Sequence, residues 1–302
     1  MTDLLTYLAY RAGAGIFGAL PEPIIRRLGG WAGSLCWFWA RERKAMAIRH
    51  MGRVLGRSDD ARAVERVARD VFSAYGRYWA ETLWFRPRRA EAVRSRVTLV
   101  GLEHVRAAQE SGRPIVAALP HVGNWELAGT LAEDAGVRIT AVAEALANRR
   151  LARWFVDLRA RLGIRVVLAE GLSTMRALRN DMLEGRVIAL VADRNIGGRC
   201  VEVEFFGERT TLPAGPAVLA IRNDAVLLPV VSYFKRGAGH RVVVHAPIED
   251  PGPEDRNRMA GITQRLAHRY EDMIREAPTQ WHLVQPNWPS DHDFLERHGG
   301  DA

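Results

Sequence analysis

The sequence predicts an α/β protein with a largely parallel central sheet flanked by helices, preceded by an N-terminal helical layer. Three observations lead to this fold class. Residues 1–90 carry apolar side chains at helical spacing and show no strand pattern. From Val97 onward, short apolar runs rich in β-branched residues alternate with segments of helical length. Such alternation is typical of βαβ units, in which parallel strands are buried on both faces of a sheet.

The first ninety residues predict helices only. Their apolar side chains recur at helical spacing over residues 3–20, 23–51 and 58–85. The polar run at residues 58–60 is a suitable start for the third helix, because its short side chains can bind free backbone N–H groups. Pro87 marks the end of that helix, since proline cannot continue it.

The rest of the chain predicts alternating strands and helices. The expected strands are residues 114–119, 138–143, 165–169, 187–192, 201–206, 226–234 and 241–247. The expected helices are residues 124–134, 148–162, 173–183, 214–223 and 254–276. No linker is long enough to indicate a domain boundary. We therefore expect residues 1–302 to form a single domain, with helices over 1–90 and an α/β core over 91–302.

The composition is that of a globular protein. The 302 residues are 48% hydrophobic and 26% charged, which provides ample apolar material for a core and excludes a disordered chain. Cys36 and Cys200 lie far apart in sequence, so neither a disulfide framework nor a zinc site is expected.

The chain is basic: 43 Lys and Arg residues against 35 Asp and Glu residues give a net charge of +8. This excess predicts attraction to nucleic acid, to an anionic membrane face or to phosphorylated small molecules.

The N-terminal helices carry a pattern typical of a membrane surface. No apolar run reaches the roughly 18 to 20 residues that a membrane-spanning helix needs, so the chain is not expected to cross a bilayer. Trp31, Trp37 and Trp39 lie between the basic clusters at residues 26–27 and 41–44, an arrangement that favours interfacial binding. The alternative, that these tryptophans pack against the core, remains open because amphipathic helices usually face a core.

One glycine-rich match is not expected to bind a nucleotide. Gly13-Ala-Gly15-Ile-Phe-Gly18 fits the G-x-G-x-x-G pattern, but no strand precedes it and its neighbours have helical spacing. We interpret it as a site of close helix packing. The serine elbow, the P-loop and the H-E-x-x-H zinc motif are absent from the sequence, so the corresponding hydrolase, nucleotide and metalloprotease functions are not indicated.

The segment around His121 is the most informative. A buried-type strand at residues 114–119 is followed by a turn containing Gly123 and by Asn124, a good helix N-cap. His121 therefore lies beyond the carboxyl end of a parallel strand, where α/β proteins build ligand crevices. Glu126 falls in the first helical turn, where its carboxylate is expected to accept a hydrogen bond from the imidazole, as a base and its orienting partner require. A capping glutamate beside an incidental histidine is the alternative.

These residues also carry a resemblance. The stretch His121-Val-Gly-Asn-Trp-Glu126 is similar to the His-x4-Asp/Glu motif of glycerolipid and lipid A acyltransferases, and its surroundings resemble the lauroyl/myristoyl transferase branch. Further blocks agree at residues 189–195, 201–220 and 281–288. The last block, together with residues 143–144 and the helix that carries Arg159, resembles most the actinobacterial phosphatidylinositol mannoside acyltransferases.

This resemblance implies an acyl-CoA-dependent O-acyltransferase that moves a long-chain acyl group to a mannose hydroxyl of a phosphatidylinositol mannoside. It implies His121 as the general base, Glu126 as its partner and Asp193 as a second acid closing on the histidine. Asp193 departs from the pattern, because this acid is often a glutamate, one methylene longer. Glu144 and Arg159 would line the groove for donor and acceptor. Within the single domain, the N-terminal helices of residues 1–90 would associate with the membrane, and residues 91–302 would form the catalytic core.

Other charged and polar residues near the expected crevice are candidates for substrate binding. Arg194, Arg199 and Arg222 are expected to meet the phosphates of coenzyme A or of inositol, although solvated surface positions are equally consistent with an arginine-rich chain. The helix start at Asn124 offers free backbone N–H groups to an anion.

The resemblance also implies the partners and the location of the protein. It implies a peripheral protein on the anionic cytoplasmic face of the plasma membrane, with acyl-CoA as donor substrate rather than resident cofactor. No metal is expected as partner, and no nucleic acid, because no basic patch interleaved with stacking aromatic residues is present. Two alternatives remain open: a related acyltransferase acting on another glycolipid or lysophospholipid, and a non-enzymatic basic protein that binds membranes or nucleic acid.

Overall fold

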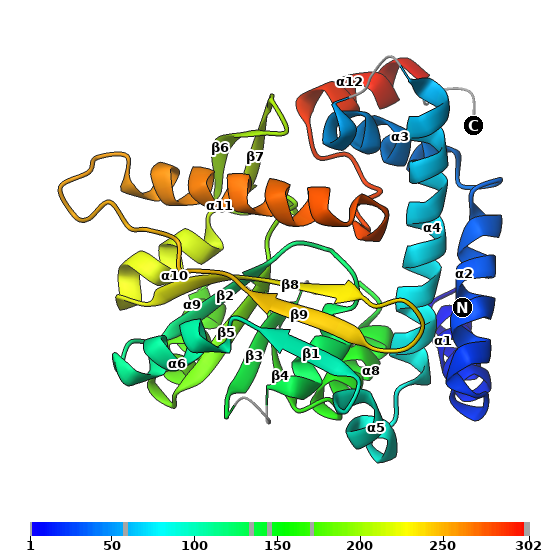
Figure 1. The fold of residues 1–302 in the computed structure, drawn as a ribbon, viewed down its shortest axis with the longest axis horizontal. Coiled ribbons are helices and arrows are strands. Elements are labelled where there is room, and N and C mark those ends of the chain that lie inside the picture. Colours follow the sequence, from blue (N-terminus) through cyan, green and yellow to red (C-terminus); the bar gives the residue numbers. More distant parts are fainter. Residues whose placement is uncertain (1, 57–59, 133–135, 144–146, 170–171, 299–302) are drawn as a thin grey trace.

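A seven-stranded sheet forms the centre of the molecule (Figure 1). The computed structural model describes residues 2–56, 60–132, 136–143, 147–169 and 172–298. Only the β8–β9 pair is antiparallel among the paired strands of this sheet, so the predicted α/β class with a largely parallel sheet is confirmed. In spatial order the strands are β1 (Val97–Val100), β9 (His240–Val244), β8 (Val226–Phe234), β2 (Ile115–Leu119), β5 (Arg186–Val191), β3 (Arg138–Ala143) and β4 (Ile164–Leu168).

Helices cover both faces of this sheet and build the N-terminal layer (Figure 1). The N-terminal layer comprises α1 (Thr2–Ala19), α2 (Glu22–Cys36), α3 (Arg41–Leu55) and α4 (Ala61–Trp84). The later helices are η1 (Pro87–Arg89), α5 (Ala90–Arg94), α6 (Leu102–Glu110), α7 (Trp125–Ala128), η2 (Gly129–Leu131), α8 (Arg149–Ala160), α9 (Leu172–Leu183), α10 (Gly215–Asn223), α11 (Arg258–Glu276), η3 (Pro278–Gln280) and α12 (Pro289–His298). None of the described helices combines the length and the apolar character that crossing a bilayer requires.

A separate antiparallel hairpin lies beside α11 (Figure 1). It consists of β6 (Cys200–Phe205) and β7 (Glu208–Pro213). The sequence predicted β6 but not β7, β1 or α6. β1 is a four-residue edge strand whose side chains alternate between half-buried and exposed, so it lacks the continuous apolar run of the central strands.

Glycines on α2 and α4 bring these two helices into backbone contact. A Cβ atom on Gly33 would lie 2.1 Å from the Phe72 carbonyl oxygen, and one on Gly76 would lie 2.1 Å from that of Gly29. The glycine-rich run on α1 behaves differently from our expectation. A Cβ atom on Gly13 or Gly15 would meet no atom within 4 Å of the described structure, and only Gly18 lies close to a neighbour, Arg86.

The segment predicted as one helix over residues 23–51 is broken in two, because the chain turns between α2 and α3. At this turn Trp37 is buried and packs edge-on against Phe72, with ring centroids 5.4 Å apart. Trp31 and Trp39, by contrast, are 64% and 73% exposed. The three tryptophans therefore divide between the two alternatives, one in the core and two on the surface.

Alternation along the strands gives the sheet two distinct faces. Val116 and Ala118 of β2 pack into the main core with residues of α9, α10 and α11. Ile115, Ala117 and Leu119 of the same strand point to the other face, where they pack with residues of α6. The second face also carries the cavity described below.

Candidate active site

The loop between β2 and α7 holds His121 in a fixed position. Gly123 turns the chain with a φ of 62°, and a Cβ atom there would lie 1.9 Å from the Ser232 carbonyl oxygen, so only glycine fits. The backbone N–H of His282 donates to the carbonyl oxygen of His121 at 2.8 Å. The His282 imidazole Nε2 donates to the carbonyl oxygen of Gly123 at 2.9 Å. Burial lowers the pKa of His282 to about 3, so this ring is neutral at physiological pH.

His121 is paired with Asp193. The imidazole Nδ1 lies 2.5 Å from Oδ1 of Asp193, and the backbone N–H of His121 donates to Oδ2 at 2.9 Å. Each residue stands two positions beyond the end of its strand, and these strands, β2 and β5, are parallel neighbours with Leu119 opposite Val191. The direct contact that the sequence left uncertain is therefore present, despite the shorter side chain of aspartate.

Asp193 is fully buried and charged. Burial raises the pKa of its carboxyl, but the neighbouring His121 and the hydrogen bonds to Oδ1 and Oδ2 more than offset this, so the pKa lies below the usual value. One of those bonds comes from the indole Nε1 of Trp281, at 2.7 Å from Oδ2. A charged carboxylate accepts the Nδ1 proton of His121, which leaves Nε2 of the imidazole free to act as a base.

Glu126 does not contact the imidazole, contrary to our expectation; it forms an ion pair with Arg159 of α8. The guanidinium Nη2 lies 2.6 Å from Oε1 of Glu126, and Nε lies 3.0 Å from both carboxylate oxygens. A guanidinium can bind both carboxylate oxygens at once, which a single imidazole N–H cannot do. Burial alone would lower the pKa of Arg159, but the charge of Glu126 raises it above the usual value. The Tyr78 hydroxyl donates a longer bond to Glu126, at 3.4 Å.

A cavity of about 400 Å³ adjoins these residues on the α6 face of the sheet. Its described lining contains four ionisable side chains, His121, Glu126, Arg159 and Arg194, and is otherwise almost entirely aliphatic or aromatic. Both Leu119 and Ile115 line it, so the cavity follows the whole of β2, a length of roughly 13 Å at the usual rise per residue. Its volume and lining suit a long apolar chain whose polar end lies beside the histidine.

Several residues expected to bind substrate lie elsewhere. Asn124 is fully buried; its side chain caps α7 at the backbone N–H of Leu127 (3.1 Å) and donates to Glu81 at 3.3 Å. Arg199 and Arg222 are exposed and do not line the cavity. Of the three arginines proposed to meet phosphates, only Arg194 lies in the cavity wall. Glu144 lies outside the described residues.

Two residues of the site escaped prediction. The block at residues 281–288 entered the sequence analysis only through the motif resemblance, which gave Trp281 no role; Trp281 is buried and its indole N–H donates to Asp193. Tyr78 belongs to α4 and stacks on Trp125 with ring centroids 4.5 Å apart. No local motif marks it, because its role depends on how α4 packs against α7. The described part of the chain contains no group of three or more His, Cys, Asp or Glu side chains able to hold a metal ion.

Sequence similarity places this fold and site in a class of enzymes. The chain belongs to the family described as bacterial lipid A biosynthesis acyltransferase, whose model matches residues 2–290. More particular relatives carry one name, phosphatidylinositol mannoside acyltransferase. One, from Mycolicibacterium smegmatis, is 33% identical over 291 residues, covering 95% of this chain and 92% of that protein. Another, from Mycobacterium tuberculosis, is 35% identical over 298 residues, covering 96% and 91%. The resemblance inferred from the motifs is confirmed.

Proposed function

We propose that this acyltransferase moves a long-chain fatty acyl group from acyl-CoA to a mannose hydroxyl of a phosphatidylinositol mannoside. One observation carries the proposal: the His121–Asp193 pair stands at the wall of an apolar cavity of about 400 Å³. The acceptor is suggested by the name of the relatives, which match more than nine-tenths of the chain. Acyl-CoA acts here as a substrate, and neither a resident cofactor nor a metal takes part.

His121 acts as a general base in a direct transfer. The hydroxyl oxygen of the acceptor attacks the thioester carbonyl carbon while its proton passes to Nε2 of His121. The carbon–sulfur bond then breaks, the new ester remains on the sugar, and the proton on Nε2 passes to the departing thiolate of CoA. The charge of Asp193 stabilises the imidazolium formed between these steps. No enzyme nucleophile is required, and base assistance of this kind accelerates a reaction by roughly 10² to 10⁴.

Glu126 and Arg159 bind each other in the wall of the cavity, and neither orients the imidazole of His121 directly. Their ion pair ties α7, which directly follows the His121 loop, to α8. Glu126 is therefore a positioning residue for the base, and Arg159 and Arg194 supply positive charge beside the reacting thioester and the polar part of the donor. Glu144, from the same motif group, remains part of the proposed groove. The enzyme works as a peripheral protein on the anionic cytoplasmic face of the plasma membrane, where its acceptor resides.

The test is an acyl-transfer assay with a panel of acceptors. Purified enzyme is incubated with palmitoyl-CoA and, separately, a phosphatidylinositol mannoside, a lipid A precursor and a lysophospholipid, and CoA release is followed with a thiol reagent. We expect release with the mannoside, and a new ester on a mannose ring by mass spectrometry. Release only with another acceptor would transfer the proposal to that substrate. If CoA release with every acceptor is no faster than with the His121→Ala variant, the proposed function is overturned.

A further inference from the structure

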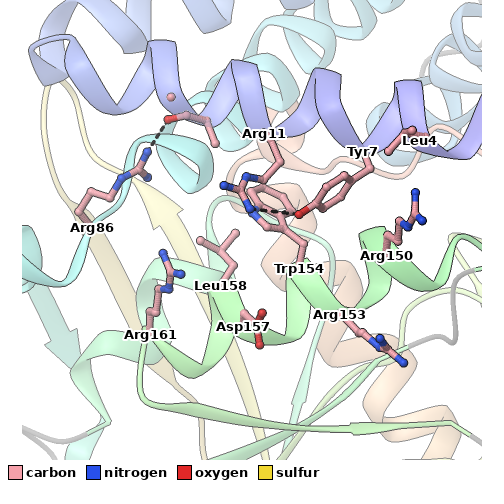
Figure 2. Close-up of a pocket in the computed structure, with 12 residues that line it drawn as sticks. Leu4, Tyr7, Arg11, Arg86, Arg150, Arg153, Trp154, Asp157, Leu158 and Arg161 are labelled. Carbon is pink, nitrogen blue, oxygen red and sulfur yellow. Dashed lines mark hydrogen bonds between the residues drawn. The ribbon is translucent and has the colours of Figure 1, made fainter.

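A second hollow, distinct from the apolar cavity, lies between α1 and α8 (Figure 2). Its volume is about 550 Å³. We call it the arginine cleft. It lies on a different face of α8 from the cavity, because Trp154 and Leu158 line the cleft whereas Phe155 and Arg159 line the cavity. The described residues that line the cleft are Leu4, Tyr7, Arg11, Ala14, Gly15, Arg86, Arg150, Arg153, Trp154, Asp157, Leu158 and Arg161.

The arginine cleft is strongly positive. Among its described lining residues five are arginines and one, Asp157, is a carboxylate. Arg86 is held rigidly, because its guanidinium donates to the carbonyl oxygens of Leu83 at 2.9 Å and Phe85 at 2.7 Å, and to that of Ala14 on α1. Burial first, and then the nearby charge of Arg161, lower the pKa of Arg86. Arg86 and Arg161 therefore lie close enough to repel each other.

Three of these cations are available to a ligand. The side chains of Arg150, Arg153 and Arg161 form no hydrogen bond or ion pair with another residue in the part of the chain that the structure describes, and all three are exposed. Asp157 lies one helical turn from both Arg153 and Arg161, yet no ion pair joins it to either. Arg150 and Arg153 lie one helical turn apart near the start of α8, whereas Arg161 follows its end (Figure 2). Guanidinium groups without carboxylate partners suit a phosphate, which accepts several N–H bonds at once.

Helix α1, which forms one wall of the arginine cleft, carries several exposed apolar side chains. Leu4 lines the cleft and is 42% exposed, and α1 also exposes Leu5, Leu8 and Ile16, at 60%, 50% and 64%. Trp31 of α2 adds a further exposed aromatic side chain in the same N-terminal layer. Apolar side chains that insert, next to arginines that meet headgroups, form the pattern by which a helix lies on an anionic membrane.

We propose that the arginine cleft binds the phosphodiester headgroup of an anionic phospholipid, while the exposed apolar residues of α1 enter the adjoining bilayer. The inference concerns lipid binding and does not depend on acyl transfer. It fixes the orientation of the molecule on the membrane, since α8 also carries Arg159 of the cavity wall. An acceptor lipid held in the same bilayer would then reach the cavity from the side of α1 and α8.

The experiment measures binding of purified protein to vesicles by flotation, without acyl-CoA. Vesicles contain phosphatidylcholine alone, or with an equal molar fraction of phosphatidylglycerol or of phosphatidylinositol. The test variant is R150Q/R153Q. The matched control is R176Q/R179Q, which removes two exposed arginines at the same spacing from α9, on the other face of the sheet. Thermal melting followed by circular dichroism shows that all variants fold.

Wild-type protein should bind both kinds of anionic vesicle. R150Q/R153Q should bind them at least about tenfold more weakly, because each basic residue at a membrane surface contributes about 1 kcal/mol, roughly fivefold in affinity. The control should bind as the wild type does. Removing the acid with Asp157→Asn should strengthen binding several-fold. Equal binding to the two lipids identifies the phosphate group as the ligand, and tighter binding to phosphatidylinositol identifies the inositol phosphate headgroup. Wild-type binding by R150Q/R153Q, or an equal loss in the control, would overturn the proposal.

Discussion

Helix α8 separates two hollows that use charge in opposite ways. In the cavity wall Glu126 binds Arg159, and His121 binds Asp193 just behind the surface, so these four side chains are paired and fixed. In the arginine cleft the guanidinium groups of α8 have no such partners among the described residues. Paired charges position one another and fix protonation states, as a catalytic base needs, whereas unpaired cations suit an anionic ligand from outside.

The largest effect is expected for His121→Ala. The variant removes the only group proposed to move a proton, so the turnover number should fall at least about 100-fold. His121 is about 28% exposed and its side chain is not part of the core, so the thermal midpoint should change little. CoA release at saturating substrate measures the effect. Near-wild-type turnover would show that the paired charges beside the cavity serve structure alone.

Asp193→Asn should reduce turnover by roughly 100-fold, because the amide is isosteric but cannot stabilise an imidazolium by its charge. A merely structural role would lower protein stability and leave the turnover number of the folded protein unchanged. We therefore expect the loss to appear in kcat, measured at saturating substrate on folded protein, with the KM for acyl-CoA little changed. Reduced stability with an unchanged kcat would remove Asp193 from the mechanism.

Local sequence patterns predicted the histidine but not its partner. The strand at residues 114–119 and the turn after it placed His121 beyond the carboxyl end of a parallel strand, and in the structure His121 lies there and lines the cavity. Spacing alone favoured Glu126, which is close in sequence, whereas the partner is Asp193, more than seventy residues further on. That pairing depends on β2 and β5 being neighbours in register, with Leu119 opposite Val191. Only the motif resemblance pointed to Asp193, because strand order is a property of the assembled sheet.

The arginines illustrate the same limit. Arg194, Arg199 and Arg222 were selected because they were expected to lie beside the crevice, but only Arg194 lines the cavity. The arginine cleft was not anticipated, since it joins α1 to α8 across more than one hundred residues of sequence. A helical face that looks like ordinary solvated surface in the sequence becomes a cationic hollow only when a second helix packs beside it.

Glu126→Gln should reduce activity about tenfold, less than either variant of the His121–Asp193 pair, because Gln can still accept a hydrogen bond from Arg159 but carries no charge. The free energy of unfolding should fall by about 1 to 3 kcal/mol, as measured by urea titration, since a largely buried guanidinium loses its counter-charge. A loss as large as that of His121→Ala would make Glu126, rather than Asp193, the partner that matters to the base.

Ala117→Leu should change which acyl chain is used. Ala117 lines the apolar cavity from β2, so added methyl groups shorten the space for a chain. We expect the ratio of activity with long-chain to medium-chain acyl-CoA to fall about fivefold. Ala107→Leu, at an exposed position of α6, is the matched control and should leave the ratio unchanged. An unchanged ratio in Ala117→Leu would mean that the acyl chain lies outside this cavity.

The smallest effect concerns the pH dependence of stability near the His121 loop. Burial lowers the pKa of His282 from its usual value of 6.5 to about 3 in the folded protein. Below pH 6.5 the unfolded chain therefore binds a proton on this histidine, whereas the folded chain does not. This histidine should therefore lower the free energy of unfolding by about 1 kcal/mol as the pH falls from 7 to 5.5. His282→Gln, which can still donate to Gly123, should remove that dependence, whereas His292→Gln, at an exposed position of α12, should retain it. Urea titrations at the two pH values provide the measurement.

Vesicle binding through the arginine cleft should not change in these histidine variants, because arginine stays charged between pH 5.5 and 7. A change in vesicle binding would show that the arginine cleft is coupled to the His121 loop and the apolar cavity, rather than independent of them.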